Sequence, residues 1–163
     1  MLHAKIEAIQ ALFAQSAFNE NSAFQVKIKG NRLLIPYRFD IRQSTPKCIQ
    51  SALQTRATNG FIRQQGLLQL LRTPCDFNTP FIIQLLSEYV LDIHLACIKY
   101  CQQQHQAFTG FAHENPCYLA KSIQRSISYW NAYYRQRYAH YHLFPAYQLL
   151  RNMQEQSELS HCN

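Results

Sequence analysis

Aromatic and cationic side chains are concentrated near the C-terminal end of the chain, in residues 125–147. Seven of the eleven Tyr and Trp residues lie in this segment, together with three arginines and two histidines. Aromatic faces stack on nucleic-acid bases and hold guanidinium groups, so this is where we expect a partner to bind. The residues expected in such a surface are Tyr129, Tyr133, Arg125 and Arg137.

The rings of this segment fall on two stripes of a helix predicted over 117–141. The first stripe is predicted to be the buried face, and it comprises Ile123, Ile127, Trp130, Tyr134, Tyr138 and Tyr141. The second stripe comprises Tyr129, Tyr133 and His140. A helix in a bundle needs one buried stripe only, so the second stripe meets either another helix or a partner. The sequence leaves these two alternatives open.

Two carboxylates, Glu88 and Asp92, lie four residues apart in an apolar segment predicted to form one helix over 80–106. Like charges at this spacing repel each other, so the pair should need a cation. We expect a structural ion pair with an arginine of the last long helix, Arg125 or Arg135. Acid–base catalysis by Glu88 and Asp92 is the enzymatic alternative, but no motif supplies the further polar group that it requires.

Two cysteines and two histidines share another face of the same predicted helix: His94, Cys97, Cys101 and His105. These are zinc-ligand types, but the helix would rise about 16 Å from the first to the last, too far for one ion. Paired C-x-x-C knuckles are absent as well. We therefore expect reduced thiols that pack as small apolar side chains, with no metal and no cofactor. A glycine-rich phosphate loop and a G-x-S-x-G elbow are also absent from the sequence.

The alternation of apolar and polar residues over 24–39 predicts a β-hairpin with its turn at Gly30-Asn31. This register sets Ile28 opposite Leu33, Val26 opposite Ile35 and Phe24 opposite Tyr37. An isolated hairpin is only marginally stable, so the apolar face should pack against helices. The opposite face carries three cations that we expect to be exposed: Lys27, Lys29 and Arg32.

The rest of the chain is predicted to be mostly helical. The fold class that follows is mainly α: one antiparallel helical bundle over 1–155 with the N-terminal hairpin packed against it. Further helices are predicted over 4–14, 46–56, 61–72 and from Pro145 to about Gln154. The polar tail, 156–163, is predicted to be disordered.

Composition favours an anionic partner. The 163 residues are 47% hydrophobic, which excludes a disordered protein, and they carry a net charge of +7. We expect a cytoplasmic protein without a membrane segment, because the most apolar segment is interrupted by polar residues. The leading hypothesis is a non-catalytic binding or adaptor protein for an unknown protein partner. The alternative is a nucleic-acid-binding module that uses the basic hairpin face and the aromatic helix, and an enzyme using Glu88 and Asp92 ranks third.

Overall fold

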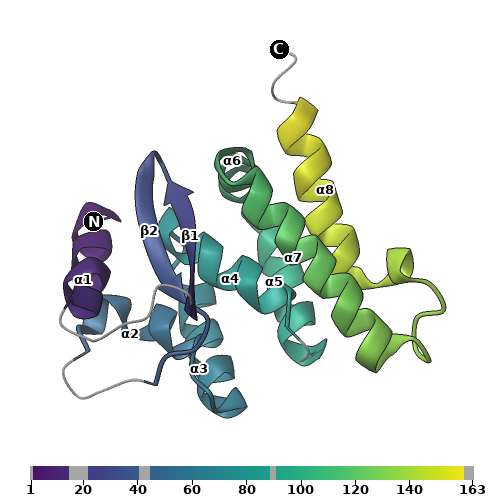
Figure 1. Ribbon diagram of the computed structural model, residues 1–163, viewed down its shortest axis with the longest axis horizontal. Coiled ribbons are helices and arrows are strands. Elements are labelled where there is room, and N and C mark those ends of the chain that lie inside the picture. Colours follow the sequence, from purple (N-terminus) through teal and green to yellow (C-terminus); the bar gives the residue numbers. More distant parts are fainter. Residues whose placement is uncertain (1, 15–21, 41–44, 89–90, 160–163) are drawn as a thin grey trace. The chain divides into compact units, whose positions relative to one another are not determined.

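A computed structural model describes residues 2–14, 22–40, 45–88 and 91–159 (Figure 1), with the side chains of residues 91 and 92 outside this description. The protein is mainly α-helical, with a two-stranded antiparallel hairpin near the N-terminus that packs against helices. The predicted fold class is confirmed. The chain forms two compact units that divide between Phe81 and Ile82.

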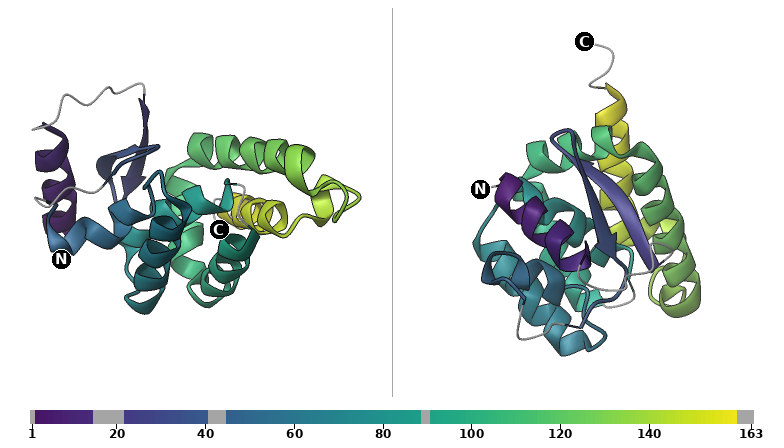
Figure 2. Two further views of the ribbon diagram at one scale, coloured as in Figure 1. Left: turned by 90° about the horizontal axis from the view of Figure 1, so that it is seen from below. Right: turned by 60° about the vertical axis from the view of Figure 1, so that its left-hand side comes forward.

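The N-terminal unit combines the hairpin with short helices. It contains α1 (Leu2–Ala14), β1 (Ala23–Ile28), β2 (Asn31–Pro36), α2 (Lys47–Gln54), α3 (Gly60–Arg72) and the 3-10 helix η2 (Asp76–Asn78), and α4 (Thr79–Leu86) crosses the division. Strand β2 packs against α1 (Figure 2). The buried residues of α1, Ile6, Ile9 and Phe13, are spaced as expected for one face of a helix.

The hairpin turn lies at Lys29-Gly30, one residue earlier than the predicted Gly30-Asn31. Both residues have positive φ, 49° and 78°, as a type I′ turn requires, and Gly suits its second position. The side-chain amide of Asn31 donates hydrogen bonds to the main-chain oxygens of Ile28 and Lys29, at 3.3 and 3.1 Å. Asn31 therefore stabilises the turn from the first position of the return strand.

The strand register consequently differs from the prediction by two residues. Val26 lies opposite Leu33, and Phe24 lies opposite Ile35. The side-chain period of a strand is two, so a shift of two keeps every residue on its predicted face. The buried residues are Phe24, Val26, Ile28, Leu33 and Ile35, and the exposed cations are Lys27, Lys29 and Arg32.

The α2–α3 connection is held by two buried arginines that the sequence did not single out. Arg56 donates from Nε and Nη2 to the carbonyl oxygen of Thr55, at 2.9 and 2.6 Å. Arg63 donates from Nη1 to the carbonyl oxygens of Ala57 and Thr58, both at 2.9 Å. A buried charge is tolerated only where it is well hydrogen-bonded, so these arginines serve the fold of this connection.

The C-terminal unit consists of helices joined by turns, with no strand in its described part. It contains the remainder of α4, then α5 (Leu91–Gln103), α6 (His105–Glu114), α7 (Pro116–Tyr129), the π-helix η3 (Trp130–Tyr134), the 3-10 helix η4 (Tyr141–Leu143) and α8 (Pro145–Leu159). Helices α7 and α8 run antiparallel and side by side, and α5 and α6 also contact α8 (Figures 1 and 2).

The helix predicted over 80–106 is interrupted: α4 ends at Leu86 and α5 begins at Leu91. After Leu86, Ser87 lies in a turn, and its main-chain N–H and its hydroxyl both donate to the Gln84 carbonyl oxygen, at 3.2 and 2.9 Å. Glu88 follows in this turn, so Glu88 and Asp92 do not lie on one continuous helix. The prediction of one continuous helix was wrong, and the repulsion between the two carboxylates stays a prediction.

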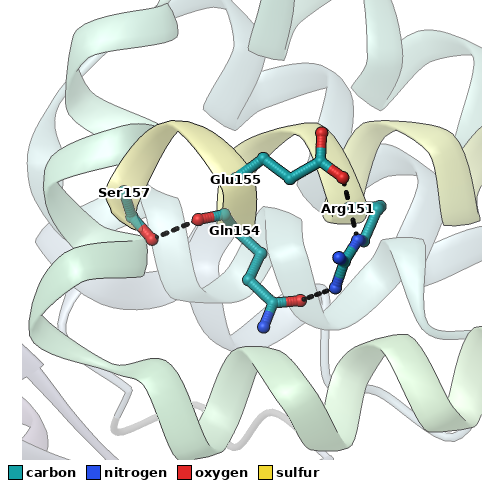
Figure 3. Close-up of polar contacts among 4 residues, drawn as sticks. All are labelled: Arg151, Gln154, Glu155 and Ser157. Carbon is teal, nitrogen blue, oxygen red and sulfur yellow. Dashed lines mark hydrogen bonds and ion pairs between the residues drawn. The ribbon is translucent and has the colours of Figure 1, made fainter. Parts of the chain in front are cut away.

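Helix α8 is longer than predicted and runs to Leu159. Ser157 is buried, and its hydroxyl donates to the Gln154 carbonyl oxygen at 2.7 Å (Figure 3). Residues 156–159 are therefore helical where the sequence predicts a disordered tail. The last part of that predicted tail, 160–163, lies outside the described residues.

Candidate binding surface on the C-terminal unit

The segment that joins α7 to α8 contains most of the rings predicted to form a binding surface. We name residues 129–144 the aromatic tip; it is the green-to-yellow connection at one end of the α7–α8 pair in Figure 1. The α-helical part of α7 ends at Tyr129, and a π-helical turn follows from Trp130 to Tyr134. Such turns are rare and often lie at functional sites. The prediction of a continuous helix to residue 141 was wrong. The stripes assigned at α-helical spacing therefore do not hold beyond residue 130.

One ring anchors the aromatic tip in the core. Phe144 is fully buried, and Tyr134 stacks on it with ring centroids 5.2 Å apart and planes inclined by 20°. Tyr138 and His94 contact the same ring edge-on, at 5.7 and 5.6 Å. Trp130 Nε1 donates to the Tyr138 carbonyl oxygen at 2.8 Å and thereby closes the loop after the π-helix. These contacts fix the aromatic tip internally.

The first predicted stripe is only partly the buried face of α7. Trp130, Tyr134 and Tyr138 are half-buried, and Tyr141 is 41% exposed. The fully buried positions of α7 are instead Tyr118, Leu119, Ser122 and Ser126. The two serines donate their hydroxyls to main-chain oxygens of the preceding turn, at 3.0 and 2.7 Å, so burial leaves them hydrogen-bonded. Hydrophobic periodicity does not reveal a buried face made with serines.

The second predicted stripe reaches the surface. Tyr133 is 63% exposed, and its ring stacks with that of half-buried Tyr129, at a centroid distance of 6.1 Å and an angle of 23°. His140 and His142, both exposed, lie almost parallel to each other at 5.2 Å. The aromatic tip therefore presents flat ring faces on its exterior.

Two exposed arginines lie against rings of the aromatic tip. The guanidinium carbon of Arg135 lies 5.9 Å from the centroid of the Trp130 ring, and that of Arg137 lies 5.9 Å from the centroid of the Tyr138 ring. Such contacts orient a guanidinium while leaving its N–H groups able to bind an anion. Arg125, the third predicted arginine, is half-buried one turn before Tyr129. Arg135, expected as an ion-pair partner of the carboxylates, thus lies in the aromatic tip.

The charged side chains of the segment that contains the aromatic tip are of one sign. Residues 115–154 contain five Lys or Arg and no Asp or Glu. One of the five, Arg151, is neutralised by Glu155 one turn further along α8, with Nε to Oε1 at 3.0 Å, and also binds Gln154 at 2.9 Å (Figure 3). The other four are Lys121, Arg125, Arg135 and Arg137. Counting acidic residues by segment would have revealed this asymmetry from the sequence.

The predicted hairpin cations belong to the N-terminal unit. Lys27 pairs across the strands with Arg32, and both are exposed on one face. Lys29, at the turn, forms an ion pair with Asp76 at 2.5 Å. These three residues therefore form a basic hairpin face distinct from the aromatic tip, and part of its charge is engaged within the N-terminal unit.

The predicted catalytic carboxylates offer less than the aromatic tip. Glu88 is buried, with 3% of its surface exposed, and the side chain of Asp92 lies outside the described residues. Their ion pair with Arg125 or Arg135 stays a prediction.

The His and Cys stripe is divided between two helices. His94, Cys97 and Cys101 are buried on α5, whereas His105 is exposed on α6 and contacts Gln156 of α8. Burial raises the pKa of both thiols and lowers the pKa of His94 to about 4, although the main-chain oxygens of Glu88 and Leu85 and the Glu88 charge oppose the latter shift. Over the described part of the chain, no three His, Cys, Asp or Glu side chains converge as a metal site would need.

Comparison of the chain with known protein families, with curated proteins and with solved structures finds no match. Within the ranges that the structure describes, no helix has both the length and the apolar character needed to cross a membrane.

Proposed function

We propose that this protein is a non-catalytic binding protein that captures an anionic partner through the aromatic tip. The observation that carries this proposal is the combination of exposed rings and exposed arginines in a segment without acidic residues. A surface potential of one sign attracts a partner of the opposite sign and speeds its association. Tyr and Arg are also the side chains that most often carry binding energy once they are desolvated.

Three buried groups in the described part of the chain have a shifted pKa. They are His94, Cys97 and Cys101, and each shift favours the uncharged form. A thiol with a raised pKa is a poor nucleophile, because the thiolate is the reactive species. A catalytic group, in contrast, needs a pKa near the working pH and access to substrate.

Binding of the whole protein to fluorescent heparin, a sulfated polyanion, tests the proposal. The double variant Arg135→Gln/Arg137→Gln should bind about tenfold more weakly at low salt, because two of the cations at the aromatic tip are lost. The matched control is Lys47→Gln/Arg72→Gln, which removes the same charge from two exposed positions of the N-terminal unit. If both double variants lose affinity equally, net charge alone explains the binding and the proposal is wrong.

A further inference from the structure

We infer that the anionic partner of the aromatic tip is a single-stranded nucleic acid, with bases stacked on the Tyr129–Tyr133 pair and phosphates held by Arg135 and Arg137. This inference rests on the function proposed above and names the class of partner. The stacked tyrosines can bind bases, and the exposed arginines can bind phosphates. No acidic residue in this segment would repel the phosphates.

The exposed rings favour a partner that has flat faces of its own. Tyr133 is 63% exposed and continues a stack that begins with Tyr129 at 6.1 Å. Bases of a single strand can extend such a stack, and each stacked base strengthens binding without requiring a particular sequence. In a duplex the base faces are covered by their neighbours, so a duplex would gain only from the charges.

The exposed cations contact rings of the same segment. The Arg135 guanidinium lies against Trp130, the first residue of the π-helix that also contains Tyr133. A nucleotide places its phosphate next to its base, so a surface that alternates rings with cations matches this repeat. The exposed amide side chains of Asn131 and Gln136 add groups able to hydrogen-bond base edges.

Other anionic partners match fewer of these features. An acidic peptide supplies charge but no series of ring faces. An anionic membrane surface would be expected to meet a broad apolar face, whereas the large aliphatic side chain exposed on the aromatic tip is Leu143, at 46%. Exposed positions between the rings are otherwise small or polar, such as Ala132 and Ala139.

The test compares probes that share phosphates but differ in bases. Fluorescence anisotropy of the whole protein is measured with an oligothymidine of about 15 nucleotides, near the upper end of known site sizes, and with an abasic strand of equal length. A duplex and vesicles of phosphatidylserine with phosphatidylcholine complete the set. We expect the oligothymidine to bind about tenfold or more tightly than the abasic strand, since each stack is lost without its base.

Variants connect this preference to the aromatic tip. Tyr133→Ala should weaken oligothymidine binding about tenfold and leave binding of the abasic strand unchanged. Tyr133→Trp should bind the oligothymidine as tightly as the unchanged protein, because a Trp ring also stacks on bases. Phe61→Ala removes a ring that is even more exposed, 80% on α3, and should have no effect. Arg135→Gln/Arg137→Gln should weaken binding to both the oligothymidine and the abasic strand. The plot of log K against log salt should become less steep by about 1.4, because two phosphate contacts are lost. A thermal melt checks that each variant is folded.

The outcomes separate this inference from the proposed function. Equal binding of the oligothymidine and the abasic strand, both dependent on Arg135 and Arg137, would leave the polyanion-binding function standing and overturn the nucleic-acid inference. Tighter binding to vesicles than to the oligothymidine would overturn it as well. If none of the polyanions binds in a way that depends on these arginines, both proposals fail.

Discussion

Phe144 is the residue on which the internal order of the aromatic tip depends most. Its ring is fully buried and contacts Tyr134, Tyr138 and His94. Phe144→Ala should lower the free energy of unfolding by about 3–5 kcal/mol, the usual range for a buried ring replaced by Ala. Urea denaturation measures the change. Leu143→Ala, at the neighbouring exposed position, is the control, and an equal loss in both variants would contradict the anchoring role of Phe144.

His94 should make the folded protein sensitive to mild acid. Burial lowers its pKa from the ordinary 6.5 to about 4, so between these pH values the unfolded chain binds a proton that the folded chain does not. The free energy of unfolding should therefore fall as the pH drops from about 6.5 to about 4, by roughly 3 kcal/mol in total.

Replacement of His94 by Leu removes the titrating group and keeps an apolar side chain in the buried site. His94→Leu should flatten the pH dependence of the urea midpoint in this window, while His105→Gln, at an exposed histidine, should preserve it. A His94→Leu protein that keeps the full acid-dependent loss would show that other groups are responsible.

At the scale of elements, the contact between α2 and α3 depends on one missing Cβ atom. A Cβ added at Gly66 would lie 2.6 Å from Gln54 Cβ and 2.8 Å from the Ser51 carbonyl oxygen. Gly66→Ala should therefore destabilise the protein by about 1–3 kcal/mol, as overpacking does. A fall in the thermal midpoint measures this.

Replacement of Gly110 in α6 by Ala should stabilise the protein, in contrast to the same change at Gly66. A Cβ there would meet nothing within 4 Å, and Ala is the better helix former. Gly110→Ala should raise stability by about 0.5–1 kcal/mol. If the two variants changed stability in the same direction, backbone freedom rather than packing would control both sites.

Periodicity in the sequence predicted the type of the elements better than their ends. The hairpin faces were correct because the alternation of residues such as Val26 and Lys27 depends only on parity, which a two-residue shift preserves. The turn itself was misplaced, since a Lys at positive φ is an uncommon choice that the pattern does not indicate.

Helix breaks and the π-helix had no signal in the hydrophobic pattern. Apolar residues lie on both sides of Ser87 and Glu88, so the pattern did not indicate that α4 ends at Leu86. In the same way, the rings continue through Trp130–Tyr134, so the wheel assigned Trp130 and Tyr134 to a fully buried stripe. The sequence left open whether Tyr133 meets another helix or a partner, and its ring is 63% exposed.

For the whole molecule, two basic surfaces are candidates for anion binding, and the sequence could not rank them. The basic hairpin face carries Lys27, Lys29 and Arg32, and Lys29 is already paired with Asp76. The triple variant Lys27→Gln/Lys29→Gln/Arg32→Gln should therefore weaken binding to oligothymidine by less than about threefold at low salt, while Arg135→Gln/Arg137→Gln weakens it about tenfold. Anisotropy titrations at several salt concentrations compare them.

A larger loss in the triple variant than in the double variant would place the principal anion-binding surface on the hairpin. The removed charge is three in one case and two in the other, so net charge alone predicts that ranking. The expected order is the reverse, which makes the comparison decisive.

Trp130 is the chain's single tryptophan, and it lies in the π-helix with Arg135 over its ring and its indole N–H bound to the Tyr138 carbonyl oxygen. The protein therefore carries an intrinsic fluorophore at the place where we expect its partner. Emission from this one side chain reports the aromatic tip without any label: quenching on addition of a nucleobase would follow occupancy. A shift to longer wavelength on warming would follow local melting of the loop, separately from unfolding of the rest of the chain.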